Sequence, residues 1–214
     1  MSQSGNDGRH SLKMRLIAQV VIASLLTQTV APAYVWAGVV ADGGAAVGKK
    51  PIVETAANGA QIVHIAPPSS RGVSTNLYTD FSVGQKGAVL NNSTTGGASS
   101  LAGSVKGNVQ LGATPASIIV NEVTSTTRST LNGSVEVLGN AADIVIANPN
   151  GISCDGCGFI NTPRASLITG RSFLSSGGAL GFNVNGGVLD VGASGLNART
   201  LGELDLIAGQ LKVN

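Results

Sequence analysis

The sequence predicts an all-β chain wound as a solenoid, and three observations support this. Short runs rich in Val, Ile and Leu are each bounded by Gly, Asn, Ser or Pro, which are turn formers. No window of about 11–18 residues has the period of an amphipathic helix. Towards the C-terminus, glycine-led segments with alternating apolar and polar residues recur every 7–9 residues, which is typical of short strands.

The predicted strands share this composition and these boundaries. They are Gln61–Ile65, Ala88–Leu90, Ser117–Val123, Val135–Leu138, Asp143–Ala147, Leu167–Thr169, Leu180–Val184, Val188–Val191, Leu204–Ile207 and Gln210–Val213. Charged residues make up only 11% of the chain, against roughly 25% in ordinary soluble domains. A bundle of charged amphipathic helices is therefore excluded.

Two architectures fit this regular spacing of short strands, a sandwich of hairpins and a parallel β-helix. Aromatic residues are 3% of the chain, which favours the β-helix, because a sandwich usually places large aromatics between its sheets. At roughly 20 residues per coil, about nine coils are expected. We expect Gly38–Ala66 to cap the first coil. The strand pattern runs on to Asn214 without a polar cap, which indicates a longer protein or a fragment.

The N-terminal 37 residues have the features of a secretory signal peptide. Arg9, Lys13 and Arg15 precede an apolar stretch over residues 16–30, and Val35-Trp36-Ala37 then matches a small-x-Ala cleavage site. We expect cleavage between Ala37 and Gly38. The alternative is a membrane anchor, but the stretch is shorter than the ~20 residues that span a bilayer.

The chain after the leader is electrically neutral. Residues 38–214 hold ten Lys or Arg and ten Asp or Glu, so the basic balance of the whole chain comes from the leader. No basic cluster is present, and few aromatics could stack on bases. The sequence therefore does not favour a nucleic-acid partner.

A compact motif follows the predicted strand Asp143–Ala147. Asn148-Pro149-Asn150-Gly151 is a tight-turn sequence, because Pro149 restricts φ and Asn150 or Gly151 tolerates positive φ. Ile152 begins the next apolar run. By itself this motif predicts no more than a turn.

In its context the motif resembles the secretion domain of two-partner secretion exoproteins, which include filamentous haemagglutinins, haemolysins and contact-dependent inhibition toxins. The resemblance covers about residues 38–207. The matching residues are Gly72–Ser74, Asn76, Tyr78, Phe81–Val83, Asn91–Asn92, Asn121–Thr124, Arg128, Leu131–Gly133, Glu136–Val137, Ala142–Ile144 and Asn148–Ile152.

This resemblance implies both a fold and a function. The implied fold is a right-handed parallel β-helix, a single-stranded solenoid of the pectin-lyase kind, with an N-terminal β cap. Residues 1–37 would be the signal peptide. Residues 38–214 would be the secretion domain, either whole or truncated at its C-terminus. The domain would direct a large exoprotein to the surface of a Gram-negative bacterium, or out of the cell, by way of the periplasm.

The resemblance also implies the partners. They are the general secretory machinery, then the periplasmic domains of a cognate outer-membrane β-barrel transporter, and after export a host or neighbouring-cell surface. Recognition by the transporter would use Asn148, Pro149, Asn150, Gly151 and Ile152. No cofactor or metal is implied.

The family often carries a second motif, Asn-Pro-Asn-Leu, upstream of the Asn-Glu-Val strand. Here the corresponding residues are Asn108, Val109, Gln110 and Leu111. The missing proline removes the restraint on φ, so this turn is expected to be looser.

Cys154 and Cys157 have C-x-x-C spacing. A redox motif would require a thioredoxin-like βαβ context, and a zinc site would require two more ligands, whereas the only histidine after the leader is His64. In an oxidising compartment the simpler expectation is a disulfide within one turn. The pair is similar to that of the haemolysin and contact-inhibition branches.

An enzyme is the least favoured reading, although polysaccharide lyases share the β-helix. Such chemistry requires carboxylates clustered on one face. The five candidates are scattered in sequence: Asp143, Asp155, Asp190, Glu203 and Asp205. We expect the last three to be solvated. The alternative to a targeting domain is a short surface adhesin or structural β-helix, or a truncated gene remnant.

Overall fold

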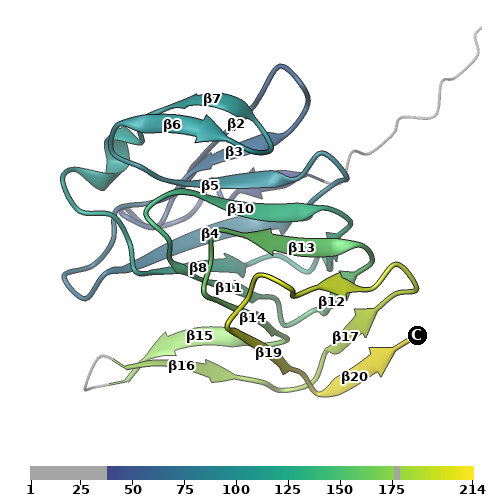
Figure 1. Ribbon diagram of the computed structural model, residues 1–214. Coiled ribbons are helices and arrows are strands. Elements are labelled where there is room, and N and C mark those ends of the chain that lie inside the picture. Colours follow the sequence, from purple (N-terminus) through teal and green to yellow (C-terminus); the bar gives the residue numbers. More distant parts are fainter. Residues whose placement is uncertain (1–37, 176–178) are drawn as a thin grey trace, which may run out of the picture. The chain divides into compact units, whose positions relative to one another are not determined.

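The computed structural model describes residues 38–175 and 179–214 (Figure 1). The predicted signal peptide, Ala37 included, lies outside the described residues. The described chain is nearly all β, with one short 3-10 turn, η1 (Val109–Leu111). Over these ranges no helix has the length and apolar character needed to cross a membrane.

Three parallel ladders form the sides of a β-helix (Figure 1). The first ladder consists of β4 (Val73–Phe81), β8 (Ile118–Val123), β11 (Asp143–Ala147), β14 (Arg164–Ile168) and β19 (Glu203–Ile207). The second consists of β3 (Gln61–His64), β5 (Ala88–Asn92), β10 (Ser134–Gly139), β13 (Cys157–Ile160) and β18 (Leu196–Asn197). The third consists of β9 (Ser129–Leu131), β12 (Ile152–Cys154), β17 (Val188–Val191) and β20 (Gln210–Val213). Each strand pairs with its counterpart one coil later, which confirms the parallel β-helix.

All ten predicted strands overlap an observed strand, but the expected nine coils were wrong. The described residues form five coils. One coil, residues 134–156, takes 23 residues, close to the expected length. The coils before and after it, residues 88–133 and 157–195, take 46 and 39 residues because each contains an inserted hairpin. The expected number came from dividing the whole length after the leader by about 20 residues per coil. It was too high because the cap and the two hairpins take up residues without adding coils.

The N-terminal cap is present and is shorter than expected. Strand β1 (Val39–Ala41) pairs antiparallel with β4, and β2 (Ile52–Thr55) pairs antiparallel with β3. Strand β3 itself joins the parallel ladder through β5, so the cap ends before Gln61. The two antiparallel strands cover edges of the first coil that would otherwise expose unpaired backbone groups.

The interior is apolar along most of its length and polar next to the cap. Side chains such as Ile144, Ile146 and Leu167 are fully buried. In β4, by contrast, Asn76 and Tyr78 are buried, and the Tyr78 hydroxyl donates to Asn121 Oδ1 at 2.9 Å. Burial raises the pKa of Tyr78 well above its usual value. Strand β4 was not predicted because these inward polar residues interrupt the apolar alternation.

Two hairpins outside the coils are each held by a buried glutamate. The turn between β6 (Gly96–Ser99) and β7 (Gly103–Lys106) surrounds the Glu136 carboxylate, which accepts hydrogen bonds from Ser99 Oγ (2.7 Å), Ser100 N (2.9 Å) and Leu101 N (3.0 Å).

The second hairpin, β15 (Arg171–Leu174) with β16 (Leu180–Asn183), is held from β8. Glu122 accepts hydrogen bonds from the backbone and hydroxyl of Ser172 and lies 3.7 Å from Arg171 Nη1. Phe182 and Val184 pack on Val120, Val145 and Ile168, so the hairpin covers an apolar strip on the outside of the first ladder.

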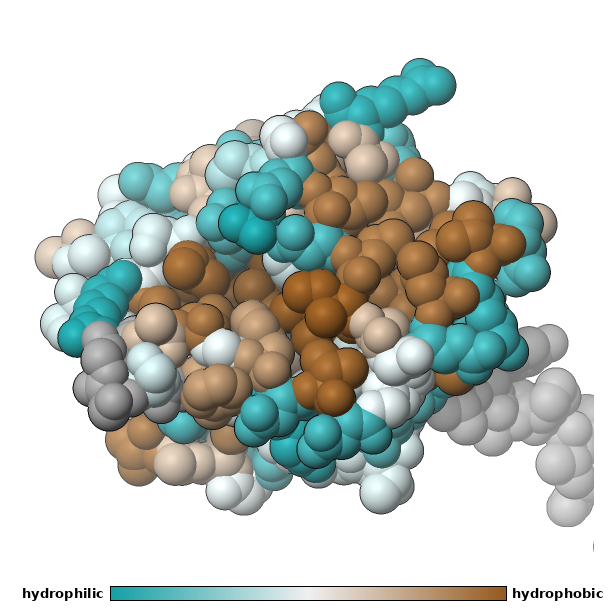
Figure 2. All heavy atoms as spheres, turned by 90° about the horizontal axis from the view of Figure 1, so that it is seen from below, coloured by the Kyte–Doolittle hydropathy of each residue, from teal (hydrophilic) through white to brown (hydrophobic). Residues whose placement is uncertain are grey.

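The last coil presents an apolar face, seen from below in Figure 2. Strands β18, β19 and β20 each lie at the edge of their sheet. Leu204 and Leu206 are half-buried there, and Val213 is 69% exposed. Strands at a sheet edge that lie beside exposed apolar side chains favour pairing with a further strand.

Glu136→Ala is expected to release the β6–β7 turn. Ser99, Ser100 and Leu101 lose the acceptor for their hydrogen bonds, and bonds to a charged group contribute about 1.5–3 kcal/mol. The free energy of unfolding in urea should fall by about 2–3 kcal/mol, and the Ser100 and Leu101 amides should exchange faster with deuterium. Glu203→Ala, which removes an exposed ion pair, should cost less than about 1 kcal/mol. Equal losses in the two variants would contradict the anchoring role of Glu136.

Candidate functional site

The candidate site is the turn that joins β11 to β12. Asn148 Oδ1 accepts the Asn150 N–H at 2.9 Å, and the Gly151 N–H donates to the Asn148 carbonyl at 3.1 Å. Gly151 has φ 108°, and a Cβ there would lie 2.8 Å from the Val188 carbonyl oxygen. Glycine is therefore required by both conformation and space, and the residues form the predicted turn.

The motif rests on the preceding coil, on the segment that follows β8 and on the first residue of β9. Asn148 Nδ2 donates to the Thr127 carbonyl and to Ser129 Oγ, both at 2.9 Å, and Asn150 Nδ2 donates to the Ser125 carbonyl at 2.8 Å. No motif in the sequence indicated Ser125, Thr127 or Ser129. No local pattern could have done so, because these contacts join residues 19–25 positions apart.

Burial separates the roles of the motif residues. Asn148 and Ile152 are fully buried, whereas Pro149 is half-buried and Asn150 is exposed. The Asn148 amide joins its own turn, through the Asn150 N–H, to the Thr127 carbonyl and the Ser129 hydroxyl of the preceding coil, which is a structural task. The surface that a partner could touch consists of Pro149, Asn150 and the adjoining residues of the 124–128 segment.

The second motif forms the same kind of turn without its proline. Asn108 Oδ1 accepts the Gln110 N–H at 3.0 Å, and the Leu111 N–H donates to the Asn108 carbonyl at 3.3 Å. Asn108 Nδ2 donates to the carbonyls of Ile65 (2.9 Å) and Asn91 (3.0 Å). The asparagine side chain therefore closes this turn as Asn148 closes the other, and the looser turn expected without proline stays a prediction.

The two motifs also share a buried anchor and an exposed tip. Asn108 and Leu111 are buried, and Val109, at the position of the missing proline, is 89% exposed. The turns occupy different corners, since one follows the β6–β7 hairpin and the other joins β11 to β12. They are two similar structures on separate parts of the surface.

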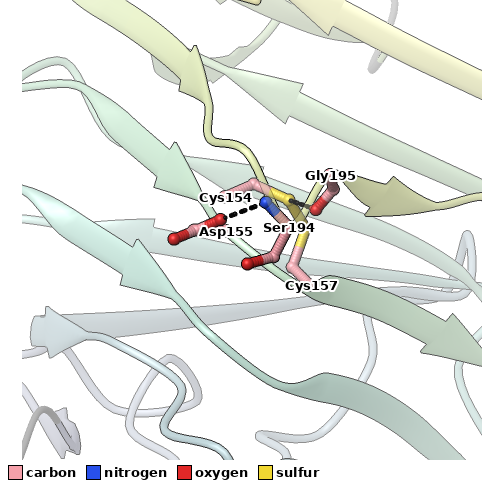
Figure 3. The surroundings of a disulfide bond; sticks show 5 residues. All are labelled: Cys154, Asp155, Cys157, Ser194 and Gly195. Atoms are coloured by element: carbon pink, nitrogen blue, oxygen red, sulfur yellow. Dashed lines mark hydrogen bonds between the residues drawn. A yellow bond between two sulfur atoms is a disulfide. The ribbon is translucent and has the colours of Figure 1, made fainter. Parts of the chain in front are cut away.

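The structure joins Cys154 to Cys157 across the turn from β12 to β13 (Figure 3). This loop lies against the corresponding turn of the next coil. Asp155 Oδ1 accepts the Ser194 N–H at 2.7 Å, and the Gly156 N–H donates to the Gly195 carbonyl at 2.8 Å. The disulfide therefore closes a loop on which the next turn is stacked.

The five carboxylates considered for catalysis are less scattered than expected. Three of them surround Arg164 on the first ladder: Arg164 Nε lies 2.8 Å from Asp205 Oδ2, its Nη2 lies 3.2 Å from Glu203 Oε1, and Asp143 interacts with it electrostatically. Asp205 is thus ion-paired, not simply solvated. In the part of the chain that the structure describes, no three His, Cys, Asp or Glu side chains could jointly hold a metal ion.

The pKa values in this cluster shift in opposite directions. The hydrogen bond from Arg164, and next that from Ser166, lowers the pKa of Asp205, so the carboxylate is held ionised. Burial raises the pKa of Asp143, which Arg164 only partly offsets. An ionised, ion-paired Asp205 stabilises the register of β14 with β19.

Reduction of Cys154–Cys157 is expected to lower stability by about 2 kcal/mol, because the bond restricts only a short loop of the unfolded chain. Urea unfolding of the oxidised protein, with and without dithiothreitol, would measure this loss. The double variant Cys154→Ala/Cys157→Ala should be insensitive to the reductant. A wild-type midpoint that reductant leaves unchanged would contradict the structural role.

Asp205→Asn is expected to destabilise the protein at neutral pH and to matter less in acid. Because the folded pKa lies below the unfolded value of 3.8, the stability due to ionised Asp205 is present above pH 3.8. It is lost as the pH falls through the lowered folded pKa. Urea midpoints at pH 7 and pH 3 would show the variant and wild type converging in acid, and a constant difference would contradict the assignment.

Comparison with known proteins agrees with this geometry. The model of the family described as "TPS secretion domain" matches residues 37–214. "Toxin CdiA" of Yersinia pestis is 43% identical over 203 residues, which are 95% of this chain and 6% of that protein. "Hemolysin" of Serratia marcescens is 49% identical over 162 residues, which are 75% of this chain and 10% of that protein.

A solved structure shares the fold. The crystal structure of the filamentous hemagglutinin secretion domain is 38% identical with a TM-score of 0.74, over 81% of this chain and 56% of that one. The chain spans about a tenth or less of the two named curated relatives. Because the family model matches residues 37–214, which include every described residue, this chain belongs to the two-partner secretion (TPS) domain family.

Proposed function

We propose that residues 38–214 are the targeting domain by which an exoprotein is recognised and exported. Residues 1–37 act as a signal peptide for the general secretory machinery, with cleavage between Ala37 and Gly38. In the periplasm, the periplasmic domains of a cognate outer-membrane β-barrel transporter bind the domain at Asn148–Ile152. The domain then completes its β-helix at the cell surface.

The observation that carries this proposal is the construction of the 148–152 turn. The buried Asn148 side chain holds the backbone of the turn in place, and the residue at its tip, Asn150, is exposed. The proposal requires that residues 125–152 pair locally in the periplasm, before the remaining coils form outside the cell. A preorganised exposed loop then binds a partner with a smaller entropic cost than a flexible one. Asn108–Leu111 has the same construction, so we propose it as a second contact for the transporter.

The low charge of residues 38–214 supports their passage outward through the transporter pore. The mature chain is neutral and has few charges, so an extended segment passing through a pore has few charged groups to desolvate. Each completed coil offers a parallel edge to the next, as β14 offers to β19. Successive pairing outside the cell would therefore favour outward movement.

The test is secretion of residues 1–214 with and without a co-expressed cognate transporter. Wild type should reach the medium only with the transporter. Asn150→Ala should reduce this transporter-dependent fraction by about tenfold, the size of a typical strong interface contact. Asn148→Ala should act more severely, because it also removes the buried support of the turn.

Asn58→Ala is the matched control. Asn58 is also exposed, and its amide also donates to a backbone carbonyl, that of Leu101 at 2.7 Å, but it lies in the cap. Its secretion should equal wild type. Release that does not require the transporter, or equal loss in Asn58→Ala and Asn150→Ala, would overturn the proposal. A short surface adhesin or a gene remnant would then explain the chain better.

A further inference from the structure

The residue beside the motif tip that no role yet explains is Arg128. We propose that Arg128 is a carboxylate-binding contact, which receives an acidic side chain from an extended segment of the transporter's periplasmic domains. This inference rests on the proposed function, because it names the chemistry that the same site recognises in its partner.

Arg128 is held in place by the motif itself. Its Nη2 donates to the Ile152 carbonyl at 3.2 Å, and its Nε lies 3.4 Å from the position that a Cβ on Gly151 would occupy. The residue is nevertheless exposed. A guanidinium has five N–H donors, so one backbone contact orients the group and leaves most donors for a ligand.

The charge of Arg128 has no counter-charge within salt-bridge distance among the described residues, whereas Arg164 and Arg171 both have one. Two acidic groups on neighbouring elements, Asp42 and Glu122, have other partners. Asp42 accepts from Thr124 Oγ1 at 2.7 Å, and this bond lowers its pKa, with Lys50 as the cation that contributes. Glu122 binds Ser172 and Arg171.

Asn150, the residue before the Gly151 against which Arg128 lies, adds an acceptor to the same turn. Its Nδ2 is used inward, by the Ser125 carbonyl at 2.8 Å and by Asn148 Oδ1 at 3.0 Å. Its Oδ1 has no hydrogen-bond partner among the described residues. The tip therefore presents guanidinium donors and one amide acceptor, which match a carboxylate and a backbone N–H of the same extended segment.

A protein carboxylate fits this surface better than a lipid phosphate does. Binding to an anionic membrane surface takes a cluster of basic residues, whereas the mature chain is neutral and has a single arginine at this tip. The planar fork of arginine binds one carboxylate in a bidentate manner. We therefore expect a single directed contact and no broad electrostatic attraction.

The experiment measures binding of mature residues 38–214 to the isolated periplasmic domains of the cognate transporter by calorimetry. Arg128→Gln should weaken the affinity about tenfold, and Arg128→Glu about a hundredfold, because it adds repulsion to the lost contact. Arg128→Lys keeps the charge without the fork and should fall between wild type and Arg128→Gln. Raising the salt from 50 to 500 mM should weaken wild type more than Arg128→Gln.

Arg199→Glu is the control for charge reversal. Arg199 is exposed, has no ion pair among the described residues, and lies between β18 and β19, far along the chain from the motif. Its affinity should stay within about twofold of wild type. Equal weakening in Arg128→Glu and Arg199→Glu, or identical salt dependence of wild type and Arg128→Gln, would overturn the inference. Binding of wild type, but not of Arg128→Gln, to anionic vesicles would overturn it in favour of phosphate.

The outcomes also separate this inference from the proposed function. If wild type does not bind the periplasmic domains, the proposed function fails. If wild type binds and Asn150→Ala weakens binding while all Arg128 variants bind like wild type, only the carboxylate contact fails. Equal melting temperatures of wild type, Arg128→Gln and Arg128→Lys would show that the turn is intact in these comparisons.

Discussion

The structure depends on satisfying backbone groups at the corners of the coils. Parallel ladders pair the strands, but each corner leaves N–H and C=O groups inside the protein, where an unpaired group is costly. Buried asparagines fill this need. Asn92, for example, accepts from the Ala116 N–H at 2.7 Å and donates to the carbonyls of Ala116 and Asn140, both at 2.8 Å. Among the described residues no buried side-chain nitrogen or oxygen lacks a partner.

The candidate site uses the same device. Asn148 and Asn108 are corner asparagines whose side chains close a turn through the N–H two residues later and bind the neighbouring segment through their amide nitrogens. At these two positions the same side chain therefore stabilises the coil and holds the exposed tip of the turn in place. A substitution of Asn148 changes both, whereas Asn150 and Arg128 lie on the exposed side and can be altered with less effect on the coil.

The inserted hairpins show how the coils carry extra structure without disturbing the ladder. Glu136 and Glu122 belong to ladder strands, yet their carboxylates bind hairpins outside the coil, Glu136 at the β6–β7 turn and Glu122 at strand β15. A buried carboxylate is acceptable there because several donors converge on it. The disulfide loop supports the next coil and not a hairpin, because Asp155 and Gly156 hydrogen-bond to the turn of the following coil.

The sequence by itself determined the fold class, ten of the strand segments and the turn at Asn148–Gly151, because alternation and turn-forming residues are local signals. The second turn, Asn108–Leu111, was located only from the family resemblance. Only the tertiary structure decided the number of coils, the inward polar face of β4, the gathering of Asp143, Glu203 and Asp205 around Arg164, and the support of Asn150 by Ser125. These features depend on contacts between residues one coil or more apart, commonly 20–50 positions along the chain. Hydrogen-bond partners at such separations leave no periodic trace in the sequence, so their pairing follows from coil register alone.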